Sequence, residues 1–219
     1  MSKGDQKYIR SLIAEGEHQA LDFKFEISDA RKIARTLSAF SNTDGGRLLI
    51  GVKDNGRISG IRSDEEFYMV ESAASLYSKP PVLFESRTYQ IDGKNILEIY
   101  IPPVKNKPVY AKQDTGRWMA YIRVGDQNQL ATIIQLELWK EEKRPLGKLI
   151  EFTRKEEILL RHLKEYPGSS LSKIRLDTGF RRKELVALMI KLVQFDVIKI
   201  SYQDGNALYT LAEKPGEPG

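Results

Sequence analysis

The pattern of apolar residues changes near Arg144-Pro145, and this change is the feature that most limits what the chain can fold into. Before it, short runs of alternating apolar and polar residues are interspersed with helical patterns. After Gly147, three helical patterns precede two short alternating runs. Proline also ends any helix that reaches it. We therefore predict two domains, residues 1–145 and 146–213, and a disordered tail over 214–219 that is charged and rich in Pro and Gly.

The first part is predicted to be a mixed α/β domain. Leu21, Phe23 and Phe25 alternate with charged residues, as in a strand that buries one face. Ser28 is expected to cap the helix that follows, and Gly45-Gly46 to end it. The expected elements are helix 7–14, strand 20–25, helix 29–42, strands 47–52 and 57–61, helix 65–77, strands 82–90, 95–101, 109–111 and 118–124, and helix 131–142.

The second part reads as three helices and a hairpin. The expected elements are helices 155–166, 171–178 and 181–195, then strands 197–202 and 207–211. Only short turns, Pro167-Gly168 and Gly179-Phe180, separate the helices, which indicates a helix-turn-helix. The terminal hairpin stands where a wing would stand. The predicted fold class is therefore α+β, a mixed α/β domain followed by a winged helix-turn-helix domain.

Two absences limit the location and the chemistry of the chain. It contains no cysteine, which excludes disulfides, thiolate zinc sites and cysteine nucleophiles and agrees with a reducing compartment. Residues 1–10 hold no apolar signal core, and no apolar run approaches the roughly 20 residues that cross a bilayer. We expect a cytoplasmic protein without a membrane partner.

The charge is modestly positive and unevenly distributed. The formal net charge of +5 favours a polyanionic partner. Residues 1–145 hold 22 Lys and Arg against 20 Asp and Glu, a net charge of +2, and residues 146–219 hold 13 against 10, a net charge of +3. Because the second part is about half as long, it is the more basic of the two.

Five short motifs in the first part resemble those of a known family. They are Leu21-Asp22-Phe23-Lys24, the run from Leu37 to Gly46, the run from Leu49 to Gly56, Lys107-Pro108-Val109-Tyr110 and Tyr121-Ile122-Arg123-Val124-Gly125. Together they are similar to the conserved domain of the Schlafen family, also described as Alba-like or divergent AAA, over residues 17–124. The resemblance implies a nucleic-acid-binding domain of bacterial regulators, which often carry a C-terminal winged helix.

The resemblance also implies an acidic site. In the Schlafen members that cleave RNA, three carboxylates form the catalytic site, and the matching positions here are Glu17, Asp22 and Asp54. Oxygen ligands of this kind hold Mg²⁺ or Mn²⁺, and Lys24 would neutralise a phosphate beside them. Asp22 stands where the family usually has the longer Glu. Asp54 also suits a turn, and Glu17 a helix end.

No further cofactor is expected. The chain has no Gly-rich loop followed by Lys and Ser or Thr, so it lacks the usual phosphate cradle for ATP. Mg²⁺ or Mn²⁺ enters only with the acidic site.

Basic residues mark the expected nucleic-acid contacts. Arg181, Arg182 and Lys183 open the third helix of the second part, where a winged helix presents its recognition helix to the major groove. The helical period also leaves Lys191 facing outward. In the first part, Arg123 lies in a family motif and is expected to hold a carboxylate or a phosphate.

A second group mixes aromatic and basic side chains around a predicted hairpin. Its members are Tyr110, Lys112, Arg117, Trp118 and Tyr121. Such a mixture is typical of a surface on which bases stack. A tryptophan in a strand is also typical of a core, so the pattern leaves both interpretations open.

The leading interpretation is a nucleic-acid-binding protein that regulates transcription. DNA is the expected partner and RNA the alternative, and a homo-oligomer is compatible with the sequence. Two other functions stay open: a divalent-metal endoribonuclease that uses the three carboxylates, and an adaptor that binds other proteins through both domains. Steep salt dependence would separate the first two from the adaptor, and metal dependence would separate those two from each other.

Overall fold

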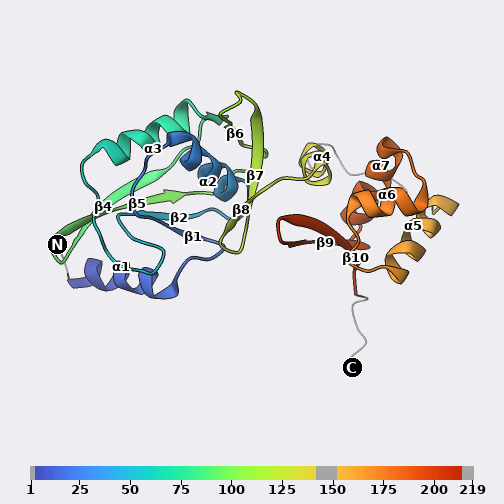
Figure 1. Ribbon diagram of the computed structural model, residues 1–219, viewed down its shortest axis with the longest axis horizontal. Coiled ribbons are helices and arrows are strands. Elements are labelled where there is room, and N and C mark those ends of the chain that lie inside the picture. Colours follow the sequence, from blue (N-terminus) through green and yellow to red (C-terminus); the bar gives the residue numbers. More distant parts are fainter. Residues whose placement is uncertain (1–2, 142–151, 214–219) are drawn as a thin grey trace. The chain divides into compact units, whose positions relative to one another are not determined.

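The computed structural model describes residues 3–141 and 152–213. These residues form two compact units, which divide between Ala131 and Thr132 (Figure 1). The predicted boundary between residues 145 and 146 and the predicted tail over 214–219 lie outside the described residues. Helix α4 (Ile133–Glu141) belongs to the second unit, because its fully buried Ile134 packs in that unit's core.

A four-stranded sheet is the centre of the first unit. Its order is β1-β2-β5-β4, in which β1 and β2 are parallel and the other pairs antiparallel. The strands are β1 (Leu21–Lys24), β2 (Gly46–Ile50), β4 (Glu85–Ile91) and β5 (Lys94–Ile101). Figure 1 shows α1 (Lys3–Glu15) on one face of this sheet and α2 (Ala30–Asn42) and α3 (Glu65–Ser75) on the other.

A second antiparallel sheet packs against α2 from the other side. Its order is β3-β6-β7-β8, with β3 (Ser78–Lys79), β6 (Tyr110–Lys112), β7 (Trp118–Val124) and β8 (Gln127–Leu130). Val109, Ala111 and Tyr121 join Leu37 and Phe40 of α2 in one core cluster. Helix α2 is therefore buried between two sheets, which explains why all its residues after Arg35 are buried.

The ends of α2 depend on residues on either side of it. The predicted cap Ser28 is exposed, and Asp29 caps the helix instead, since its Oδ1 accepts from the amide of Arg31 at 2.9 Å. At the other end Gly45 takes φ +76° and its amide donates to the carbonyl of Phe40. Glycine is favoured there because this left-handed conformation strains residues that carry a Cβ.

The predicted strand 57–61 is wrong. Without it as a hairpin partner, β2 pairs with another strand. Only Val52 and Ile58 form an isolated bridge. Gly51, at φ +94°, turns the chain, and its carbonyl accepts from the amides of Ser59 and Gly60. Strand β2 pairs instead with the more distant β5, in a register that sets Ile50 opposite Leu97. The short strands β3 and β8 have no counterpart among the predicted elements.

After α4, the second unit has the predicted order of elements. They are α5 (Arg154–Glu165), α6 (Leu171–Thr178), α7 (Arg182–Gln194), β9 (Ile198–Gln203) and β10 (Asn206–Leu211). A bridge between Ser169 and Tyr209 ties the β9–β10 hairpin to the α5–α6 connection. The centre of its core is formed by Leu159, Leu163, Ile174, Leu185, Met189 and Tyr209. The amphipathic periods of the three helices meet around this one cluster.

Candidate nucleic-acid interface

The family motifs of the first unit meet in a buried ion pair. Asp22 on β1 and Arg123 on β7 are 3% and 2% exposed, and Nη2 of Arg123 lies 3.2 Å from Oδ1 of Asp22. The guanidinium also donates to the carbonyls of His18 and Leu21 and to Oδ1 of Asn128. Arg123 was expected to hold a carboxylate or a phosphate, and in the structure it holds the buried carboxylate of Asp22.

Glu17 lies beside Asp22 but accepts a structural hydrogen bond. Its Oε1 receives the amide of Phe23 at 2.8 Å. Burial raises the pKa of Glu17, the Phe23 amide lowers it, and the neighbouring carboxylate of Asp22 raises it again, with a net upward shift. Two neighbouring carboxylates repel each other when both are charged, and this repulsion is why Asp22 raises the pKa of Glu17.

The structure does not bring the three predicted carboxylates together as one metal site. Asp54 is exposed in the turn after β2. Across residues 3–141 and 152–213, no three Asp, Glu, His or Cys side chains are grouped so that they could hold one metal ion. Nζ of Lys24 lies 2.8 Å from Oδ2 of Asp22 and donates to the carbonyl of Phe23. The charge of Lys24 is therefore paired within the first unit.

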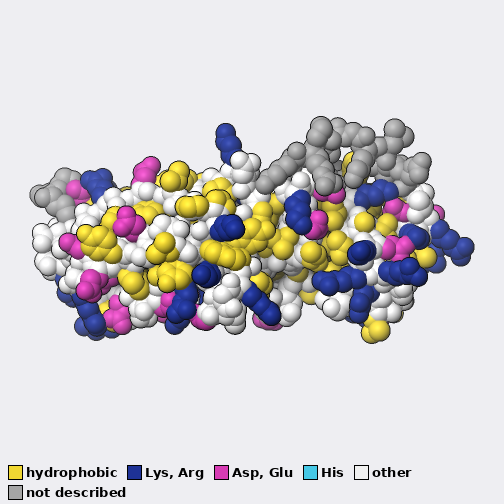
Figure 2. Space-filling model, turned by 90° about the horizontal axis from the view of Figure 1, so that it is seen from above, with side chains coloured by type: hydrophobic (Ala, Val, Ile, Leu, Met, Phe, Trp, Pro, Cys, Tyr) yellow, Lys and Arg dark blue, Asp and Glu magenta, His cyan; other side chains and the backbone are white. Residues whose placement is uncertain are grey.

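The basic residues that open α7 are exposed. Arg181 is the N-cap residue and makes no side-chain cap hydrogen bond, and Arg182 and Lys183 begin the helix. Glu184 in the same turn pairs with Lys155 of α5. Figure 2 shows Lys and Arg side chains gathered on one face of the second unit, in the right half of the view. Three adjacent cations therefore face solvent at one helix end.

Lys191, which was predicted to face outward, is partly exposed, but its charge is paired with a buried carboxylate of α5. Its Nζ lies 2.6 Å from Oε1 of Glu156, whose side chain is 3% exposed. Glu156 also completes a capping box with Thr153 at the start of α5. Burial raises the pKa of Glu156, but hydrogen bonds from Lys191, Thr153 and backbone amides outweigh it and lower the pKa to about 2. Lys191 therefore joins α7 to α5.

A family model described as Schlafen, AlbA_2 matches residues 17–132. The chain belongs to this family. The matched residues span both sheets, α2 and α3, so the Asp22–Arg123 pair and the turns at Gly45 and Gly51 all lie within the AlbA_2 domain. No curated protein matches this chain.

Two solved structures resemble parts of the chain. The DIP2311 protein from Corynebacterium diphtheriae is 18% identical, with a TM-score of 0.47, over 74% of this chain and 33% of its own. The chain thus spans about a third of that protein's length. The N-terminal domain of a protein from Nitrosomonas europaea related to the ATP-dependent DNA helicase RecG is 24% identical, with a TM-score of 0.43, over 68% of this chain and 98% of its own. Among the residues that the structure describes, no helix is both long and apolar enough to span a membrane.

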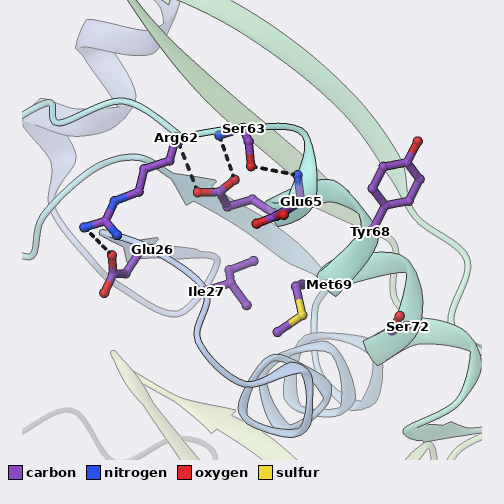
Figure 3. Close-up of a pocket in the computed structure, with 9 residues that line it drawn as sticks. Glu26, Ile27, Arg62, Ser63, Glu65, Tyr68, Met69 and Ser72 are labelled. Atoms are coloured by element: carbon purple, nitrogen blue, oxygen red, sulfur yellow. Dashed lines mark hydrogen bonds and ion pairs between the residues drawn. The ribbon is translucent and has the colours of Figure 1, made fainter.

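The AlbA_2 domain also carries a hollow that the sequence did not indicate. It has a volume of about 460 Å³ and lies at the start of α3, beside Glu26, Ile27, Arg62, Tyr68 and Met69. Figure 3 shows how its lining residues lie, with Arg62 turned toward Glu26. Arg62 pairs with Glu26 at 2.9 Å, and Glu66 accepts the amides of Arg62 and Ser63. None of the predicted site residues lines it.

The aromatic and basic group lies on the β6–β7 hairpin, as the sequence pattern predicts. The pattern did not show which of its side chains face solvent. Trp118 is 36% exposed, so it is not a core residue. Tyr121 is buried in the cluster around α2. Nζ of Lys112 lies 5.9 Å from the centre of the Trp118 ring. The strand register, which the sequence does not contain, decides which of these side chains share a face.

Proposed function

We propose that this protein binds duplex DNA through its second unit and regulates transcription. The observation that carries the proposal is the exposed trio Arg181, Arg182 and Lys183 at the first turn of α7. Positive charge at a helix N-terminus opposes the helix dipole, so a trio of cations there is unfavourable unless an anion offsets it. DNA phosphates supply that anion, and the same helix end can reach base edges in the major groove.

The arrangement of the surrounding elements supports a winged helix. Three residues, Gly179 to Arg181, connect α6 to α7, and Gly179 takes the left-handed conformation that a tight turn needs. The β9–β10 hairpin follows α7 directly, and the Ser169–Tyr209 bridge holds it to the helices. In this interpretation α7 enters the groove and the hairpin lies along the adjacent backbone.

The test compares matched variants of the full chain. Arg181→Ala/Arg182→Ala/Lys183→Ala should weaken duplex binding and flatten the dependence of log K on log salt by about 0.9 for each phosphate that the variant no longer neutralises. Arg161→Ala/Lys164→Ala is the control, because both side chains are exposed on α5 of the same unit, toward the end away from the Lys155–Glu184 ion pair. The control should leave the slope unchanged.

The regulatory part needs a separate measurement. Selection from a pool of random duplexes should return a recurring sequence, since a regulator must distinguish its site from bulk DNA. If the triple variant keeps the affinity and the salt slope of the unmodified protein, α7 is not the DNA-binding element. If selection returns no recurring sequence, the protein binds DNA without acting as a site-specific regulator.

A further inference from the structure

The second sheet of the AlbA_2 domain presents one face that the proposed duplex binding does not use. Val109 and Ala111 point into the core around α2, and Tyr121 does so from β7. Because side chains alternate along a strand, Tyr110 and Lys112 of β6 and Trp118 of β7 point to the opposite face.

The strand register places four of these side chains side by side. Lys112 is paired with Trp118, and Lys79 of β3 is paired with Tyr110. Paired residues in antiparallel strands share a face, so Lys79, Tyr110, Lys112 and Trp118 form one patch across three strands, which we call the outer patch. Lys79 and Trp118 are exposed, and the other two are partly exposed.

The strands that carry the outer patch supply no negative charge to it. Strands β3, β6, β7 and β8 contain no Asp or Glu. The nearest acidic residue along the chain is Asp114 in the β6–β7 turn, and it pairs with Arg31 at 3.1 Å and with Arg35 at 3.7 Å.

We propose that the outer patch binds single-stranded nucleic acid. Trp118 and Tyr110 offer ring faces on which unpaired bases stack, and Lys79 and Lys112 offer cations to the phosphates between them. Tyr110 and Trp118 are diagonal neighbours across β6 and β7, so their backbone positions lie about 7–8 Å apart and both side chains are on one face. A duplex keeps its bases stacked on one another, so this face selects single strands.

Tryptophan fluorescence tests the contact directly in the full chain. The protein has two tryptophans, of which Trp118 is 36% exposed and Trp139 is 3% exposed. Oligomers of about 16 thymidines or 16 uridines should quench the emission of Trp118 as bases stack on it. Quenching by either polymer supports the proposal, and the comparison shows whether DNA or RNA is preferred. The signal should disappear in Trp118→Phe, which leaves only the buried Trp139.

Affinity measurements with matched variants give the second readout. Trp118→Ala should weaken single-strand binding by about 5- to 100-fold, and Trp118→Phe by much less, because phenylalanine keeps a ring face. Met119→Ala is the matched control, since Met119 is also 36% exposed but points to the other face of the strand. Lys79→Ala and Lys112→Ala should each flatten the salt slope by about 0.7.

The outcomes separate this proposal from duplex binding by α7. The triple variant at Arg181, Arg182 and Lys183 should keep the quenching by single strands even where its duplex binding is abolished. The proposal is overturned if neither polymer quenches at low salt, if Met119→Ala weakens binding as much as Trp118→Ala, or if the α7 variant abolishes the quenching.

Discussion

The guanidinium of Arg123 and the carboxylate of Asp22 are joined inside the first unit, with Nη2 3.2 Å from Oδ1 and the two side chains 1% and 4% exposed. The ring of Phe40 lies below the guanidinium, 5.1 Å from Cζ to the ring centre. Because Arg123 also donates to two carbonyls of the segment leading into β1, it fastens the second sheet to the edge of the first.

Removing Arg123 should therefore destabilise the fold. We expect Arg123→Met to lower the free energy of unfolding by about 3–5 kcal/mol, because it breaks the buried pair with Asp22, which keeps only Lys24 beside it, and leaves the carbonyls of His18 and Leu21 without this donor. Denaturant unfolding measures this. The exposed Arg117 gives the control, since Arg117→Met should change stability by less than about 0.5 kcal/mol. Equal effects of the two substitutions would contradict a structural role for the pair.

Asn42 makes a second connection between α2 and the β3-β6-β7-β8 sheet. Its Oδ1 accepts the amide of Val109, and its Nδ2 donates to the carbonyls of Val109 and Tyr121 at 2.8 and 2.9 Å. Asn42→Leu should lower the unfolding free energy by about 2–4 kcal/mol, since it leaves buried backbone groups without partners. Denaturant unfolding of the two proteins measures the difference.

Ser41, the residue before Asn42, provides a comparison. Ser41 is fully buried, and its hydroxyl has no hydrogen-bond partner among the described residues. Ser41→Ala should thus change stability by less than about 1 kcal/mol or raise it, because it removes a polar atom that gains nothing from burial. A decrease from Ser41→Ala as large as that from Asn42→Leu would show that packing, not hydrogen bonding, governs this end of α2.

Glu156 should make stability depend on pH in the acid range. Its pKa is lowered from 4.5 to about 2 in the folded protein, so the folded state binds fewer protons there than the unfolded state. The contribution of Glu156 is complete above about pH 4.5 and is lost as the pH falls toward about 2. Urea unfolding across this range should show the loss. Glu156→Gln should make the pH dependence of stability shallower, and Lys191→Met should do so in part. If Glu156→Gln leaves the pH dependence unchanged, Glu156 is not its source.

The position of the domain boundary can be tested with two fragments. A fragment of residues 132–213 contains α4 and keeps Ile134, which is fully buried in the second core. A fragment of residues 146–213 lacks it and should be less stable by about 2–5 kcal/mol, the usual cost of deleting a large buried aliphatic side chain. Thermal melting measures the difference. Equal stability would place the boundary after α4, as the sequence pattern predicts.

Local patterns in the sequence are enough to predict most of the elements and the family. Strong signals mark them: the alternation of Leu21 and Phe23, the glycines that end α2, the Asp92-Gly93 turn between β4 and β5, and the helical periods of the second unit. Such signals depend on residues a few positions apart, so they can be recognised without knowledge of the rest of the fold. The Schlafen resemblance over residues 17–124 agrees with the match to residues 17–132 for the same reason.

The contacts of the charged and aromatic side chains, by contrast, follow from the tertiary structure alone. Arg123 and Lys191 are chemically suited to phosphate, yet each is used by a buried carboxylate from a distant part of the chain. Conversely, Lys79 joins Trp118 on one face only through the register of β3, β6 and β7. Burial and pairing between segments far apart in sequence set these roles, because desolvating a charge is costly unless a partner is supplied, and no local pattern records where that partner will be.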